Sequence, residues 1–163
     1  MNGIVALLAA GTCAALGMAA ARRLAMRERA LNAWEGALMR MAGAVSHSGD
    51  GLRDVLKKGA GEDNAVLRQL IDRMEAAPAA PPEALIRELN WESVLSDAEK
   101  ETLAACLLSL FSPSLAQQAQ AIAYAREQWA VFRLKGREAR ERDGKLYISL
   151  GWLAGAAVFI LLC

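Results

Sequence analysis

Residues 145–163 read KLYISLGWLAGAAVFILLC, and Lys145 is the last charged residue of the chain. The amino end has the same character, because residues 1–21 read MNGIVALLAAGTCAALGMAAA and the first charge is Arg22. As α-helices, the two charge-free segments would rise roughly 30 and 27 Å, close to the thickness of a hydrocarbon core. A domain this small cannot bury two helices that are apolar on every side. The sequence therefore predicts one transmembrane helix at 1–21 and another at 146–163.

All 19 basic and 18 acidic residues lie between these segments. Residues 22–45 carry five arginines and two glutamates, and residues 133–145 carry six basic and three acidic residues. Basic flanks favour the cytoplasmic side of a membrane, so we expect residues 22–145 to form a cytoplasmic domain, with both termini outside. The residues that set this topology are Arg22, Arg23, Arg27, Arg29, Arg137, Arg140, Arg142 and Lys145.

A cleaved secretory signal is the alternative for the first segment, and the stretch Ala19–Ala21 resembles a cleavage site. A signal peptide carries its positive charge before the apolar run, however, whereas here the arginines follow it. A retained anchor is therefore the better interpretation.

The domain between the segments is predicted to be helical. Apolar residues recur at steps of three, four and seven at both of its ends, namely at Leu24, Leu31, Trp34, Leu38, Met41 and Val45, and at Leu115, Ile122 and Trp129 beside Gln118, Ala125 and Phe132. Such spacing forms the seam of helices that pack on one another. Three prolines in residues 77–82 break the pattern and join two helical halves. We expect an all-α fold, a membrane-anchored antiparallel helical bundle with one transmembrane helix at each end.

Several residues are predicted to bound or bend the helices. Asp63 or Asn64 can cap one helix, and Ser96 with Glu99 has the form of a capping box at the start of another. Gly136 and Gly144 are the positions at which the last helix could bend.

No pattern in the sequence indicates catalysis or a cofactor. His47 lies in a glycine-rich turn, and Cys13, Cys106 and Cys163 lie in apolar stretches typical of buried thiols. There is no histidine–cysteine metal spacing, phosphate loop or nucleophile elbow. Residues 46–132 carry eight basic and thirteen acidic residues, a balance that does not favour nucleic acid. We expect no enzyme activity, no cofactor, no metal and no small-molecule substrate.

Small residues recur every four positions in the apolar segments. Gly151 and Gly155 form a Gly-x-x-x-Gly pair, which lets helix backbones approach closely in lipid. The alternative is that an alanine-rich protein shows small residues everywhere. The pair is thus a candidate transmembrane packing site.

The run from Lys145 to Gly155, with the hydrophobic end that follows it, resembles the closing signature of the stage III sporulation protein AB family. Further similarities are Leu16–Gly17 before the arginines, Gly51–Leu52 before a short helix, and Gln117–Gln118 early in the last long helix. The chain departs from the family where a proline is usual at Gly51. It also departs at residues 111–114, where the family favours a turn containing glycine or aspartate.

This resemblance implies a role in endospore formation, in the mother-cell membrane around the forespore and within a complex of several membrane proteins. The family is similar to the platform protein of type II secretion systems, so the chain is expected to couple a cytosolic secretion ATPase to a membrane channel. The candidate ATPase-facing acidic surface is Glu88, Glu92, Glu99 and Glu101. A scaffold that assembles neighbouring membrane proteins through its transmembrane helices, without ATPase contact, is the alternative. Stoichiometry, including a homo-oligomer, is left open.

Overall fold

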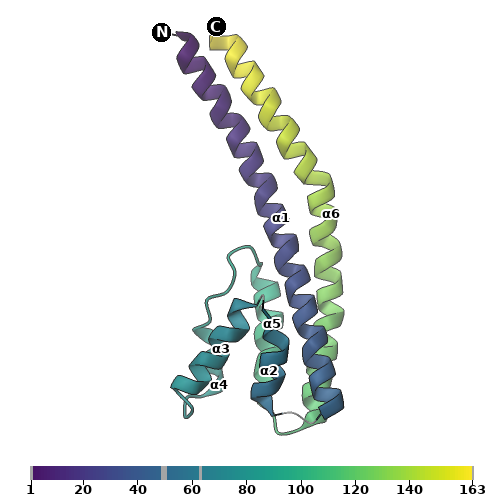
Figure 1. Cartoon of the computed structure of the whole chain (residues 1–163). Helices are drawn as coiled ribbons and strands as arrows, with labels where there is room; N and C mark the ends of the chain where they lie inside the picture. Colours follow the sequence, from purple (N-terminus) through teal and green to yellow (C-terminus); the bar gives the residue numbers. More distant parts are fainter. Residues whose placement is uncertain (1, 49–50, 63, 163) are drawn as a thin grey trace. The chain divides into compact units, whose positions relative to one another are not determined.

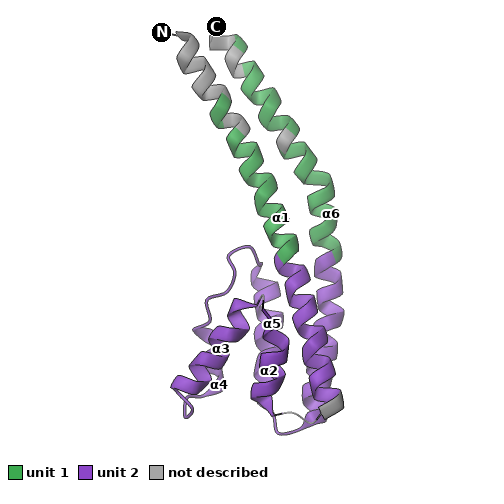
Figure 2. Cartoon of the chain, in the orientation of Figure 1, with its two compact units in different colours: residues 1–29, 134–163 green, residues 30–133 purple. Residues whose placement is uncertain are grey.

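The computed structural model describes residues 2–48, 51–62 and 64–162, and every regular element among them is a helix (Figure 1). The helices are α1 (Asn2–Ser48), α2 (Leu52–Ala60), α3 (Ala65–Ala76), α4 (Pro82–Arg87), α5 (Asp97–Ser109) and α6 (Leu115–Leu162). The chain divides into two compact units, one of residues 1–29 with 134–163 and one of residues 30–133 (Figure 2). We call them unit 1 and unit 2. The all-α prediction is confirmed.

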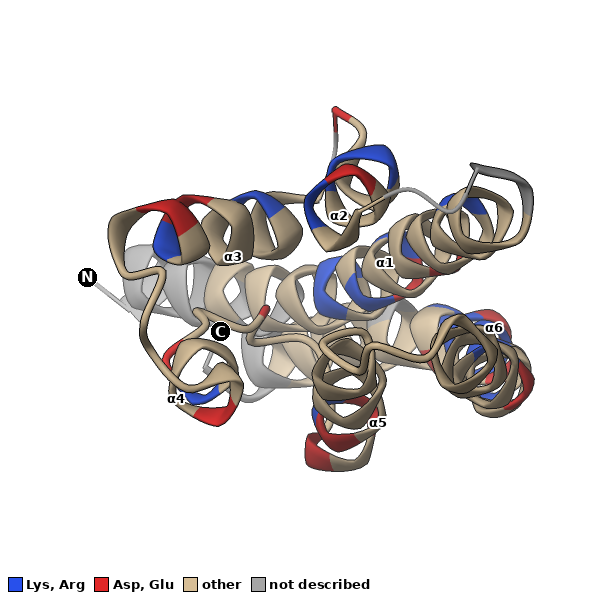
Figure 3. Cartoon of the chain, turned by 90° about the horizontal axis from the view of Figure 1, so that it is seen from below, with Lys and Arg blue, Asp and Glu red and all other residues tan. Residues whose placement is uncertain are grey.

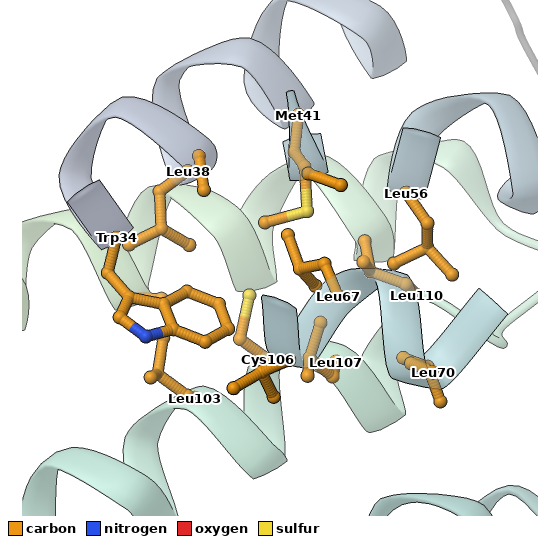
Figure 4. Close-up of a cluster of buried hydrophobic side chains, with 14 of the residues drawn as sticks. Trp34, Leu38, Met41, Leu56, Leu67, Leu70, Leu103, Cys106, Leu107 and Leu110 are labelled. Carbon is orange, nitrogen blue, oxygen red and sulfur yellow. The ribbon is translucent and has the colours of Figure 1, made fainter. Parts of the chain in front are cut away.

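Unit 2 has a continuous core to which all six helices contribute. Trp34, Leu38 and Met41 of α1 meet leucines of α2, α3 and α5 (Figure 4). The seam predicted in α1 is confirmed within this unit, because all its members from Leu31 to Val45 are buried. In α6 the seam holds at Ile122 and Trp129, but the prediction for Leu115 is wrong.

Leu115 is half exposed because it is the first residue of α6, and the side chain of Gln118 occupies the inward position one turn later. The Gln118 carboxamide donates to the carbonyl oxygens of Leu110 and Ser112, at 3.0 and 2.7 Å. These carbonyls belong to the end of α5 and the turn that follows, where no helical partner is available. Gln118 therefore fixes the α5–α6 connection.

Two of the predicted caps are observed. The Asn64 side chain accepts a hydrogen bond from Leu67 N at 3.0 Å, while Asp63 lies outside the described residues. Ser96 and Glu99 form the complete capping box at the start of α5. The break at residues 77–82 also holds, since α3 ends at Ala76 and Pro82 begins α4 in the first-turn position that suits proline.

Two glycines allow α2 to lie against α1. A Cβ at Gly59 would lie 2.5 Å from the Cγ of Met41, so only glycine fits without movement. Gly61 ends α2 with φ of 51°, a backbone conformation that glycine adopts without strain. Arg40 completes this end by donating to the carbonyl oxygens of Lys58 and Gly59, at 3.0 and 2.8 Å.

Unit 1 consists of the outer parts of α1 and α6. A Cβ at Gly17 would lie 2.6 Å from the carbonyl oxygen of Tyr147 and 3.1 Å from the Cα of Gly151, so the two backbones are in close contact there. Gly155 is buried as well. Helix α6 continues through Gly136 and Gly144 without interruption.

Among the described residues, no helix contains a stretch both long enough and apolar enough to span a membrane. The predicted membrane segments 1–21 and 146–163 fall partly outside the described residues. Side chains are not described at 1–10, 13, 14, 148, 158, 159 and 161–163.

Candidate interaction surfaces

Helices α4 and α5 of unit 2 enclose a shallow cleft of about 330 Å³ between them. Its lining is Ile86, Arg87, Trp91, Asp97, Lys100, Glu101 and Ala104. The four lining residues of α5 are spaced i, i+3, i+4 and i+7 along the sequence. This spacing puts them on one face of the helix, which forms one wall of the cleft. Acidic positions on α4 and α5 are visible in Figure 3. The cleft combines an apolar floor with charges of both signs.

Trp91 gives the cleft a rigid floor. Its ring lies 6.0 Å, centre to centre, from that of Trp34 in α1. Trp34 in turn lies 6.4 Å from Trp129 of α6, whose indole N–H donates to the carbonyl oxygen of Leu31 at 2.8 Å. The connection between α4 and α5 is thereby held to the core of unit 2, and the cleft does not depend on a free loop.

Of the four predicted acidic residues, Glu101 fits the predicted surface best. It is exposed, it lines the cleft, and it has no ion pair among the described residues. Glu88 is exposed too, but its carboxylate pairs with Arg73 of α3. An exposed pair of this kind contributes little to stability, so a partner's cation could replace Arg73.

The prediction that Glu99 faces a partner is wrong. Its side chain is 0% exposed, and its carboxylate accepts a hydrogen bond from Ser96 N at 2.6 Å in the capping box. The helix start needs this acceptor for an otherwise unpaired backbone N–H. Glu99 therefore has a structural role.

Glu92 is half buried, and its Oε2 atom is buried with no hydrogen-bond partner among the described residues. Burial raises the pKa of this carboxyl because the charged form loses hydration. Glu92 thus also differs from the prediction, which placed it among exposed acidic residues.

Arg87, Lys100 and Trp91 were not among the predicted site residues. The Nζ atom of Lys100 lies 3.6 Å from a carboxylate oxygen of Asp97, which precedes it by one helical turn. The spacing of Asp97, Lys100 and Glu101 on one helix face was a usable signal in the sequence. Arg87 and Trp91 precede α5 in the sequence, and only the tertiary structure shows that they line the same cleft.

The predicted basic flanks lie in unit 1. Arg22, Arg23, Arg29 and Lys145 are exposed, and Arg27 is half buried. Three flanking arginines form ion pairs, namely Arg137 with Glu141, Arg140 with Glu28, and Arg142 with Asp143. The hydrogen bond and charge of Arg137 lower the pKa of Glu141, and the same contact raises the pKa of Arg137.

No group of three or more potential metal-ligating side chains occurs in the part of the chain that the structure describes. Cys106 is buried in the core of unit 2, and burial raises the pKa of its thiol to about 12. A thiol in this state is a poor nucleophile at neutral pH. The side chains of Cys13 and His47, and all of Cys163, lie outside the described residues.

These features define a class: an all-helical protein whose candidate sites are a charged cleft and helix–helix contacts. The chain belongs to the stage III sporulation protein AB family, whose model matches residues 2–163. Family membership indicates a role in sporulation. No curated protein and no solved structure matches the chain.

Proposed function

We propose that this protein is a non-enzymatic membrane platform subunit of a sporulation-specific secretion or channel complex, coupling a cytosolic secretion ATPase to the channel. Family membership supports the sporulation role. The observation that carries the ATPase contact is the α4–α5 cleft, where exposed charges surround an apolar floor held by the core. A polar rim around an aromatic anchor is typical of protein–protein interfaces.

The membrane part of this proposal rests on the composition of unit 1. Residues 1–21 and 146–163 carry no charge, and large apolar side chains there are exposed, among them Leu16 at 71%, Trp152 at 65% and Leu153 at 66%. Exposed apolar side chains in such number are costly in water and favourable in lipid. The basic flanks support a topology with unit 2 in the cytoplasm and both termini outside. Membership of the sporulation family supports the mother-cell membrane around the forespore as the membrane concerned.

Calorimetric titration of the full chain in mild detergent with the secretion-type ATPase expected from the same operon tests the proposal. We expect saturable binding, weakened at least about tenfold by Glu88→Lys with Glu101→Lys, because reversed charges on the predicted acidic surface, of which Glu101 lines the cleft, repel a partner that the native charges attract. The matched control is Glu75→Lys with Glu127→Lys, which also reverses one paired and one unpaired exposed acid of unit 2. Equal effects of the two double variants would contradict a contact at the cleft.

The second candidate function is a scaffold that assembles neighbouring membrane proteins through unit 1, without ATPase contact. The exposed apolar side chains of α6, such as Leu150 and Leu153, favour it. Gly151, by contrast, already packs against Gly17 of the same chain. A scaffold predicts that Leu150→Ala with Leu153→Ala removes the partners that co-purify with the chain, while the acidic-surface variant Glu88→Lys with Glu101→Lys retains all of them.

A further inference from the structure

We propose that unit 1 binds one anionic phospholipid in a cleft between α1 and α6, with its phosphate between Arg22 and Lys145. The inference rests on the membrane anchoring proposed above. The cleft has a volume of about 600 Å³. Its lining is Met18, Ala21, Arg22, Ala25 and Glu28 of α1, with Arg140, Glu141, Gly144 and Lys145 of α6.

The position of the cleft matches the depth of a lipid headgroup. Arg22 is the first charged residue of the chain and Lys145 is the last, so the cleft lies where both charge-free segments end. On the charge-free side of Arg22 its wall is formed by Met18 and Ala21, which offer an apolar surface to an acyl chain. A phospholipid fits both parts of the cleft, because it carries an anionic headgroup for the basic residues and an apolar acyl chain for the apolar wall.

The charges that line the cleft are not all satisfied within the protein. Arg140 pairs with Glu28, and Glu141 pairs with Arg137, which lies outside the cleft. Arg22 and Lys145 have no hydrogen bond and no ion pair among the described residues. The charge of Lys145 helps to lower the pKa of the Glu141 carboxyl, and the lining as a whole carries three basic and two acidic residues, an excess of one positive charge. Basic pockets at the cytoplasmic ends of membrane helices bind anionic headgroups.

The cleft is open because its walls are small. Ala21 and Ala25 contribute only methyl groups, and a Cβ placed at Gly144 would meet no atom within 4 Å. Arginine can hold a phosphate through two parallel hydrogen bonds, and lysine adds a point charge.

Native mass spectrometry of the full chain tests this site, with the protein released from nanodiscs of zwitterionic phosphatidylethanolamine that contain a minor fraction of phosphatidylglycerol. We expect one phosphatidylglycerol to be retained. Arg22→Gln with Lys145→Gln should weaken its binding about thirtyfold. Ala25→Leu, which fills the cleft without changing charge, should also weaken it. Arg23→Gln with Lys135→Gln removes the same two residue types from exposed positions of unit 1 outside the cleft, and should leave binding within about twofold.

Equal losses in the two charge variants would overturn the site, because they would indicate attraction to the basic flank as a whole. Displacement of the lipid by inorganic phosphate would also overturn it, since the acyl chain would then contribute nothing. Incorporation into nanodiscs without preference for the anionic lipid contradicts this inference alone. Failure of the wild-type chain to enter nanodiscs contradicts both this inference and the proposed membrane anchoring.

Discussion

At the scale of single residues, Gly59 shows how closely α2 and α1 are fitted. We predict that Gly59→Ala lowers the melting temperature of the full chain, because its Cβ would lie 2.5 Å from the Cγ of Met41, which is fully buried. Overpacking of this kind costs about 1–3 kcal/mol, more than the gain in helix propensity of up to about 1 kcal/mol. Thermal unfolding followed by circular dichroism in detergent measures the shift.

Gly43→Ala is the matched control, because a Cβ at Gly43 of α1 meets no atom within 4 Å. It should leave the melting temperature unchanged or raise it by a few degrees. If both variants raise the melting temperature, the close contact between α2 and α1 is contradicted.

Glu92 gives a prediction on pH. Its pKa is raised from 4.5 by burial, so between the unfolded and folded pKa values the folded state binds more protons than the unfolded state. Stability contributed by this group is therefore present below about pH 4.5 and falls as the pH rises through the folded pKa. We expect Glu92→Gln to stabilise the protein at pH 7 and to have little effect at pH 4.

Melting curves of the wild type and Glu92→Gln at several pH values measure this difference. Glu101→Gln, at an exposed carboxyl nearby, controls for the loss of one negative charge. A stabilisation by Glu92→Gln that is equal at pH 4 and pH 7 would exclude desolvation of the carboxylate as its cause.

At the scale of elements, Gln118 connects the end of α5 to the start of α6. Gln118→Met should destabilise unit 2 by about 1–3 kcal/mol, because it leaves two carbonyl oxygens without their donor. Gln120→Met is the control, since Gln120 is exposed on the next part of the same helix. Urea unfolding followed by far-ultraviolet circular dichroism compares the two, and an equal loss in both variants would contradict the capping role.

The pairing of α1 with α6 in unit 1 depends on Gly17. Gly17→Leu should disrupt this pair, because its side chain would meet the backbone of Tyr147 and Gly151, which cannot move aside as a side chain can. Gly11→Leu, at a position with open space, should be tolerated. Protease resistance of the full chain in micelles distinguishes the two variants. If Gly17→Leu remains as resistant as Gly11→Leu, the backbone contact is contradicted.

The helical elements were largely predictable from the sequence because periodicity and caps are local signals. Asn64, the Ser96–Glu99 box and the proline break all act within a few residues of their own positions. The candidate cleft was less predictable. The capping box already gave Glu99 a local partner, but only the packing of unit 2 shows that this side chain is buried and that Trp91 lies on Trp34.

At the scale of the whole molecule, the proposed function requires one chain to present a charged domain to the cytoplasm and two apolar ends to lipid. The distribution of charge allows this, because every charged residue lies in the range from Arg22 to Lys145 and the two ends carry none. The ion pairs of unit 1 neutralise Arg137, Arg140 and Arg142 near the predicted membrane surface, whereas Arg22 and Lys145 form no ion pair with any residue that the structure describes.

The membrane topology of the whole chain can therefore be tested directly. In a heterologous bacterial host, alkaline phosphatase fused to either terminus should be active, because this enzyme folds only outside the cytoplasm, where disulfides form. The same enzyme inserted after Glu62, an exposed residue in the turn that follows α2, should be inactive. Replacing Arg22, Arg23, Arg27 and Arg29 by glutamine should reduce phosphatase activity at the amino terminus, since these arginines hold the following domain inside. Activity at the Glu62 insertion in the wild-type background would place unit 2 outside the cytoplasm and rule out contact with a cytosolic ATPase.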